Sequence, residues 1–329
     1  MSKLLLHIGP HKTGSTFIQK FFADNSARLA ELGVHYPQRG LAGQYGQHEL
    51  VEKVRSLDTE ALIDYLAAYL GGESTFLSSE NFDRLKADDL AKLAGALAAL
   101  LGETPDVRIL FYHRNYADLL PSWWQEEVKH GGVLSFHAFV LPHVLRPFAS
   151  NLVNPGLVLD LWASAFGKER VTIVDYDRAR EDLLAPIFSL LGVELGAWEN
   201  QVINSSMKVE LVEVLRALNS IAKARNEWHF HRTRALFLRK MRDPEIADEL
   251  DEVLAIVRAH LKSVKIAGGF FEKAVGTAFR AKYESRYLNR PYDVQPERDL
   301  QVADDVWLIR GAPYCERIFD HLMSGDVSY

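Results

Sequence analysis

The chain has 329 residues, of which 48% are hydrophobic, and a formal net charge of −6. This is enough apolar material for one large α/β domain or for one domain with a helical extension. The negative charge argues against a broad electrostatic affinity for nucleic acid. With a single cysteine, Cys315, the chain can form no internal disulfide, and a cysteine-based zinc site is not expected.

The apolar runs of the sequence are short. The run near the start, residues 4–8, is too short for the core of a signal peptide. No later segment approaches the roughly 18 uninterrupted apolar residues that a membrane helix needs. We therefore expect no transmembrane segment and a cytoplasmic location.

Short apolar segments alternate with helical patterns along the first half of the chain. Residues 4–8 form a first candidate strand, followed by a turn and a helix with Phe17, Ile18, Phe21 and Phe22 on one stripe. Further candidate strands cover residues 34–36, 75–78, 107–112 and 171–175. Because strands that alternate with helices imply right-handed crossovers, the pattern predicts an α/β fold in which a parallel sheet carries helices on both faces.

The pattern changes near residue 207. From there on it is helical, with Leu211, Leu215 and Leu218 at helix spacing, and no Gly/Ser/Pro-rich linker precedes it. We therefore predict an α/β core over residues 1–206 and a mostly helical part over residues 207–329, packed on the core. The polar, basic and aromatic segment 225–234 is either a solvated loop or a lid over an anionic ligand.

The strongest local signal is GPHKTGST, residues 9–16, between a candidate strand and a candidate helix. Such a turn directs backbone N–H groups and the positive end of the helix dipole at one spot, which suits a phosphate. The spacing nearly matches the P-loop pattern G-x-x-x-x-G-K-[ST], but Ser15 stands at the lysine position and the lysine lies upstream, at Lys12. Because an ATP-using enzyme needs that lysine on the terminal phosphates, the substitution counts against a kinase.

A second anion-binding pattern follows in the middle of the chain. The candidate strand VRILFYHR ends in Arg114, and Ser122 follows eight residues later on the expected helix. An arginine at a strand end and a serine two turns into the next helix can converge on one oxyanion, the arginine as a forked donor and the serine through its hydroxyl.

Together, the two patterns resemble the sulfotransferases that use 3′-phosphoadenosine 5′-phosphosulfate (PAPS). Residues 203–208 (INSSMK) resemble the Asn-x-Ser segment of the bacterial and carbohydrate-type branch, whereas Asn115-Tyr116 departs from the family's usual Asp-Pro. The resemblance implies a P-loop, sulfotransferase-like three-layer fold, PAPS as co-substrate, 3′,5′-diphosphoadenosine (PAP) as product, and no metal. It also implies the residues that bind PAPS: Lys12, Thr13, Gly14, Ser15 and Thr16 at the 5′-phosphosulfate, and Arg114 and Ser122 at the 3′-phosphate.

Sulfuryl transfer is similar to phosphoryl transfer, in which positioning and charge stabilisation supply most of the rate. Lys12 is the candidate to meet the charge that grows on the leaving phosphate oxygen. Glu80, just after the third candidate strand, and His48 compete for the role of the base that takes the proton of the acceptor hydroxyl. Glu80 could instead be a first-turn carboxylate that stabilises a helix dipole, and His48 could instead contact the acceptor.

The acceptor is expected to be a hydroxyl-bearing small molecule or a glycan, and neither its identity nor the oligomeric state follows from the sequence. Two other functions stay open. A P-loop kinase or NTPase would use Asp175, at a strand end, as its metal carboxylate and would show magnesium-dependent ATP turnover. A catalytically silent nucleotide-binding protein would bind PAP but transfer nothing from PAPS.

Overall fold

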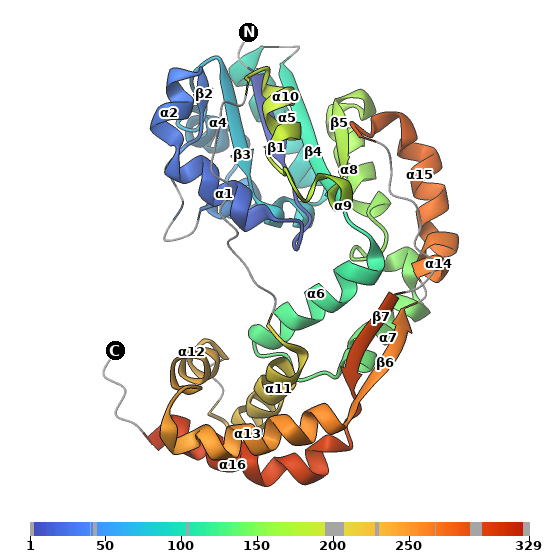
Figure 1. The fold of residues 1–329 in the computed structure, drawn as a ribbon. Helices are drawn as coiled ribbons and strands as arrows, with labels where there is room; N and C mark the ends of the chain where they lie inside the picture. The colour runs from blue at the N-terminus through green and yellow to red at the C-terminus, as the bar shows by residue number, and fades with distance from the viewer. Residues whose placement is uncertain are drawn as a thin grey trace. The chain divides into compact units, whose positions relative to one another are not determined.

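The computed structural model describes residues 3–39, 41, 45–102, 105–194, 207–227, 230–266, 268–289 and 298–324. The chain clusters into two compact units (Figure 1). The first unit consists of residues 1–115, 148–204 and 272–294, and the second of residues 116–147, 205–271 and 295–329. Among the helices of these described ranges, none is long and apolar enough to cross a bilayer.

The first unit contains a five-stranded parallel sheet in the order β2-β3-β1-β4-β5 (Figure 1). The strands are β1 (Lys3–His7), β2 (Val34–His35), β3 (Ser74–Ser78), β4 (Asp106–His113) and β5 (Val171–Asp175). All five strands that the apolar segments predict are present, and the predicted parallel α/β sheet is confirmed.

Helices cover both faces of this sheet. Because side chains alternate along a strand, Leu4 and Leu6 of β1 enter one core and Leu5 enters the other. The first core includes residues of α3 (His48–Ser56), α4 (Thr59–Ala67), α5 (Ala87–Leu101), α8 (Gly156–Phe166) and α15 (Thr277–Tyr283). The second includes residues of α1 (Ser15–Asp24), α2 (Ser26–Glu31) and α10 (Ala185–Leu191). The first unit therefore has three layers, as predicted.

The strand order determines where a ligand can enter. The connection from β1 leads to β2 on one side of the sheet, whereas β4 pairs with the other side of β1. In open parallel sheets, ligands bind outside the carboxyl ends of the strands where the order reverses. The loop after β1 and the short 3₁₀ helix η1 (Glu80–Arg84), which follows β3, both lie at this edge.

A late segment of the chain closes the β5 edge of the sheet. After α15 and the 3₁₀ turn η5 (Glu284–Arg286), the Leu288 N–H donates to the Ile173 carbonyl at 2.8 Å. The Asn289 side chain contacts both backbone groups of Asp175: its Oδ1 accepts from the N–H at 2.8 Å and its Nδ2 donates to the carbonyl at 3.2 Å. These contacts satisfy backbone groups that an edge strand would otherwise leave unpaired.

The second unit is mostly helical, as predicted. It contains α6 (Tyr116–Lys129), α7 (Phe136–Leu145), α11 (Val209–Ala224), α12 (Phe230–Lys240), α13 (Pro244–Ala259), α14 (Gly268–Phe271) and α16 (Trp307–Ser324). The sequence pattern did not predict its antiparallel hairpin of β6 (Leu261–Ile266) and β7 (Arg298–Ala303). Helix α12 includes the second half of the segment 225–234, while residues 225–227 are exposed.

The chain crosses between the units more often than the single predicted division at residue 206 implies. Helices α6 and α7 belong to the second unit, and α6 is joined to α11 by the buried Asn219 side chain, which donates to the carbonyls of Val128 at 2.7 Å and Gly132 at 3.2 Å. Arg216 on the same helix pairs with Glu213 at 2.7 Å and Asp305 at 2.5 Å. In the other direction, residues 272–294 return to the first unit.

Candidate active site

The loop between β1 and α1 contains three residues in the left-handed backbone region. Gly9 has a φ of 95°, Lys12 of 69° and Gly14 of 77°. Alternation of such residues with ordinary ones turns successive N–H groups toward one side and forms an anion-binding concavity. A non-glycine residue at positive φ costs on the order of 1 kcal/mol or more and is concentrated at functional sites. The backbone of this loop therefore fits the predicted phosphate loop.

Helix α1 begins directly after this loop. Gly14 is its N-cap residue and supplies no side-chain hydrogen bond, so the helix start has backbone N–H groups to offer to a ligand. Ser15 is buried and Thr16 is exposed. The Thr13 hydroxyl donates to the Pro10 carbonyl at 2.6 Å, so Thr13 also stabilises the bend of the loop itself.

Gly14 could not be replaced by a larger residue without rearrangement. A Cβ at this position would lie 2.4 Å from Leu183 Cδ1 and 3.7 Å from Cε2 of Tyr176, which begins α9 (Tyr176–Ala179) after β5. The positive φ favours glycine at this position, and an added Cβ would displace the Leu183 side chain. The loop is thus held against the residues that follow β5.

Arg114 lies one residue beyond the end of β4, and the structure brings it to the same loop. Its Nη1 donates to the Lys12 carbonyl, and its guanidinium carbon lies 5.0 Å from the centre of the Tyr176 ring. The neighbouring Asn115 N–H donates to Asp177 Oδ2 at 2.8 Å. Arg114 therefore braces the backbone of Lys12, whatever else it binds.

Two other predicted features, Ser122 and the Asn-x-Ser segment, stay predictions. Ser122 lies in α6, in the second unit, and is half-buried. Because Arg114 belongs to the first unit, the convergence of Arg114 and Ser122 on one phosphate stays a prediction. Residues 203–206 of the Asn-x-Ser segment lie outside the described residues.

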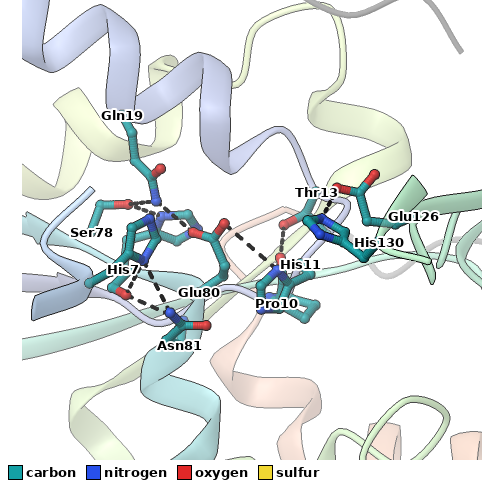
Figure 2. A network of polar contacts seen from close by, with 12 residues as sticks. His7, Pro10, His11, Thr13, Gln19, Ser78, Glu80, Asn81, Glu126 and His130 are labelled. Atoms are coloured by element: carbon teal, nitrogen blue, oxygen red, sulfur yellow. Dashed lines mark hydrogen bonds and ion pairs between the residues drawn. The ribbon is translucent and has the colours of Figure 1, made fainter. Parts of the chain in front are cut away.

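Glu80, the first residue of η1, lies beside the loop (Figure 2). Its Oε2 accepts a hydrogen bond of 2.7 Å from Nε2 of Gln19, on α1, and its Oε1 lies 3.7 Å from His11 Nδ1. The Glu80 side chain is 13% exposed, so the carboxylate is largely enclosed but within reach of the surface. Glu80 therefore packs directly against the loop between β1 and α1.

The protonation states of Glu80 and His11 are set by their surroundings. Burial tends to raise the pKa of Glu80, but His11, His48, a backbone hydrogen bond and the Gln19 amide lower it, and the net pKa lies below the usual glutamate value. Burial lowers the pKa of His11 to about 4, against the opposing effect of Glu80. At neutral pH the pair therefore consists of a carboxylate and a neutral imidazole.

His48, the first residue of α3, is oriented by residues that follow β3. Its Nδ1 lies 2.8 Å from Ser79 Oγ and 3.4 Å from Asn81 Nδ2. The Nδ2 group of Asn81 can only donate and the hydroxyl of Ser79 can donate as well, so both groups can share the one lone pair of an unprotonated Nδ1, with Ser79 the nearer donor. The neutral ring then carries its proton on Nε2 and presents a donor there. This arrangement suits a contact with an acceptor oxygen better than it suits a base.

Sequence reasoning missed three members of this network. His7 Nδ1 lies 2.8 Å from Ser78 Oγ, and Gln19 Nε2 lies 3.2 Å from the same oxygen (Figure 2). All three side chains are buried. The signal was present but weak: His7 and Ser78 are polar residues at the ends of apolar strands, and Gln19 is a polar residue on an apolar helix stripe.

Two further strand-end residues have structural contacts. His113 is buried, with Nδ1 2.5 Å from Tyr287 Oη, and burial with the charge of Arg280 lowers its pKa to about 3. Asp175 caps α9, since its Oδ1 accepts from the Arg178 N–H at 3.1 Å. Burial raises the pKa of Asp175 to about 6, chiefly against the opposing hydrogen bond from Arg178.

Within the described ranges, one group of side chains is close enough together to hold a metal ion, and it lies in the second unit: Asp243, Glu245 and His321. His321 Nε2 lies 3.3 Å from Asp243 and its Nδ1 lies 3.3 Å from Glu245. With a carboxylate at each ring nitrogen, the group forms a network of polar contacts that joins the start of α13 to α16.

Comparisons with known proteins give matches to solved structures only. No family model and no curated protein matches the sequence. A solved structure of a sulfotransferase from Alicyclobacillus acidocaldarius matches with 13% sequence identity and a TM-score of 0.41, over 67% of this chain and 95% of that chain. At this level of similarity neither a family nor a reaction follows from the match.

Proposed function

We propose that the protein is a PAPS-dependent sulfotransferase that moves a sulfuryl group to a hydroxyl-bearing small molecule or glycan and releases PAP. The observation that carries this proposal is the enclosed carboxylate of Glu80, packed against Gly9 of the loop between β1 and α1 at the carboxyl edge of the sheet. The loop supplies an anion site, and the carboxylate supplies a proton acceptor next to it.

In this proposal the loop binds the 5′-phosphosulfate end of PAPS. The N–H groups of the loop and of the first turn of α1, with the hydroxyls of Ser15 and Thr16, hold the 5′-phosphate. Arg114 and Ser122 hold the 3′-phosphate, the arginine as a charged forked donor. Lys12 stabilises the bridging oxygen between phosphorus and sulfur, on which negative charge grows during transfer.

The chemical step is an in-line displacement at sulfur. The acceptor oxygen forms a bond to sulfur while the bond from sulfur to the bridging phosphate oxygen breaks, and PAP leaves with that electron pair. The acceptor proton passes to the Glu80 carboxylate. His48, with its proton on Nε2, donates a hydrogen bond to the acceptor and orients it. The step requires no metal, because the transferred group carries a single negative charge.

The alternative, a P-loop kinase or NTPase, has less support. Ser15 occupies the position of the P-loop lysine, and the strand-end carboxylate that could hold a metal, Asp175, is fully buried and caps α9. In a catalytically silent nucleotide-binding protein, Glu80 would have only a structural role, through its hydrogen bond with Gln19 and its place in the first turn of η1.

Ligand-dependent melting tests the proposal. PAP should raise the melting temperature, whereas ATP with magnesium and adenosine 5′-phosphosulfate should raise it much less, because only PAP and PAPS fill both phosphate sites. Equal stabilisation by ATP would overturn the assignment. A screen of isotopically labelled PAPS against a metabolite extract, read by mass shift, would then identify the acceptor, and transfer to none of its components would favour the silent binding protein.

A further inference from the structure

A chain of buried hydrogen bonds leads from the sheet to Glu80. It runs from the His7 ring to the Ser78 hydroxyl at 2.8 Å, from that hydroxyl to the Gln19 amide nitrogen at 3.2 Å, and from the amide to Glu80 Oε2 at 2.7 Å (Figure 2). His7 and Ser78 are fully buried and Gln19 is 3% exposed. The surrounding protein atoms therefore fix the positions of these side chains, and solvent does not compete for their hydrogen bonds.

The direction of each hydrogen bond follows from the chemistry of the groups. The carboxylate can only accept, so the Gln19 amide must present its N–H₂ group to Glu80. The same nitrogen faces Ser78 Oγ, so the hydroxyl accepts from Gln19 and donates its own proton to His7 Nδ1. A rotated amide would place its oxygen against the carboxylate, which has no proton to donate, and would lose the hydrogen bond to Glu80.

Gly46 holds the amide from another side. A Cβ at position 46 would lie 2.7 Å from both the amide carbon and the amide nitrogen of Gln19. Protein interiors tolerate few contacts this short, so the backbone of residue 46 approaches the amide because no side chain intervenes. The Gln19 amide thus has one orientation and little room to move.

We propose that Gln19 is a positioning residue for Glu80: its amide, held by the Ser78 hydroxyl and by Gly46, fixes the carboxylate in the orientation in which it takes the acceptor proton. This inference rests on the proposed function. Gln19 contacts neither the anion loop's ligand site nor the acceptor in this scheme, and it acts through Glu80 alone.

Gln19 should also influence the titration of Glu80, because an N–H that donates to a carboxylate favours the charged form. Other titratable groups act on the same carboxylate from the neighbouring elements: His7 on β1, His11 in the loop, Tyr36 after β2, His48 on α3 and Asp83 on η1. A test must therefore change the amide without changing these groups.

The test compares Gln19→Met, which keeps the length of the side chain but removes the donor, with the wild type. Carbon-detected NMR titration of the side-chain carboxyls in the full chain should show the Glu80 pKa raised by about one unit. Gly46→Ala, which displaces the amide sterically, should raise it in the same direction and serves if Gln19→Met fails to fold. Gln38→Met is the matched control, since Gln38 is exposed and donates to the Tyr36 carbonyl, and it should leave the titration unchanged.

Turnover of PAPS gives the second readout. Gln19→Met should lower kcat on the order of tenfold with little change in the KM for PAPS, and the acid limb of the rate profile should move up with the Glu80 titration. If the wild type turns over PAPS but the Glu80 pKa is unchanged in both Gln19→Met and Gly46→Ala, this inference is overturned and the proposed function stands. A moved titration in a protein that consumes no PAPS overturns the proposed function and the positioning role with it.

Discussion

Gly9 and Glu80 are packed against each other at the carboxyl edge of the sheet. A Cβ on Gly9 would lie 3.2 Å from both the Cα and the Cβ of Glu80. Gly9 and the candidate base Glu80 are therefore in direct packing contact, although they are 71 positions apart in the sequence. A change in one is expected to displace the other.

Gly9→Ala should remove most PAPS turnover and destabilise the fold by about 1–3 kcal/mol. The substitution places a side chain at a φ of 95° and presses it against the Glu80 backbone. Urea unfolding and turnover measure the two effects. Gly95→Ala is the control, because Gly95 lies in α5 with no atom within 4 Å of the added Cβ. That variant should be as active as the wild type and slightly more stable.

Arg114→Ala and Lys12→Ala should separate binding from transfer. Arg114→Ala should weaken PAP binding by about 2 kcal/mol or more, since it removes a charged hydrogen-bond partner from a desolvated anion. Lys12→Ala should lower turnover more than PAP affinity, because the charge it meets develops mainly in the transition state. Titration calorimetry measures the PAP affinity of each variant, and steady-state kinetics measures its turnover. If both variants lost only affinity, Lys12 would not have the proposed role.

The contact of Arg114 with the Lys12 carbonyl offers a sharper test of what the arginine does. Adenosine 5′-phosphosulfate lacks the 3′-phosphate, so its affinity should change little in Arg114→Ala if the arginine mainly holds that phosphate. An equal loss for PAPS and for adenosine 5′-phosphosulfate would mean that Arg114 acts only as a brace of the loop. Arg108→Ala, on the exposed side of β4, is the matched control and should bind both ligands normally.

Glu80→Gln should cost on the order of a hundredfold or more in turnover while PAP binding stays nearly intact, because the amide keeps the shape but accepts no proton. Since the pKa of Glu80 lies below its usual value, the acid limb of the wild-type rate profile should lie in the acidic range and vanish in this variant. His48→Ala should act mainly on the KM of the acceptor. The opposite pattern, with His48 controlling the limb, would make the histidine the base.

The buried histidines should make stability fall in acid. An unfolded histidine binds a proton below about pH 6.5, whereas burial holds the pKa of His7 at about 4 and that of His113 at about 3. The unfolded state therefore binds more protons as the pH falls from 6.5 to 4, and each histidine lowers the free energy of unfolding by about 1.4 kcal/mol per pH unit. His113→Asn should remove one such contribution, measured as a shallower pH dependence of urea unfolding. The offset between the two proteins at pH 8 isolates the packing change, and parallel curves below pH 6.5 would contradict the prediction.

The sequence by itself determined the features that depend on neighbouring residues. The five strands, the helices that follow them and the glycine-containing turn between β1 and α1 could be predicted because hydrophobic periodicity, glycine backbone freedom and a helix start act over a few residues. Glu80 and His48 could be proposed as candidates, since polar residues after a strand end lie at one edge of a parallel sheet. Sequence alone could not decide which of the two is the base and which contacts the acceptor.

Only the tertiary structure decided which distant residues meet. The hydrogen bonds of Gln19 span 59 residues to Ser78 and 61 to Glu80, and Asn289 closes the β5 edge at Asp175 from 114 residues away. Local pattern also could not assign α6 and α7 to the second unit, where the Asn219 amide in α11 contacts the end of α6. Crossover connections bring strand ends together through packing of whole helices on a sheet, so the register and orientation of each side chain depend on the complete core rather than on its own segment.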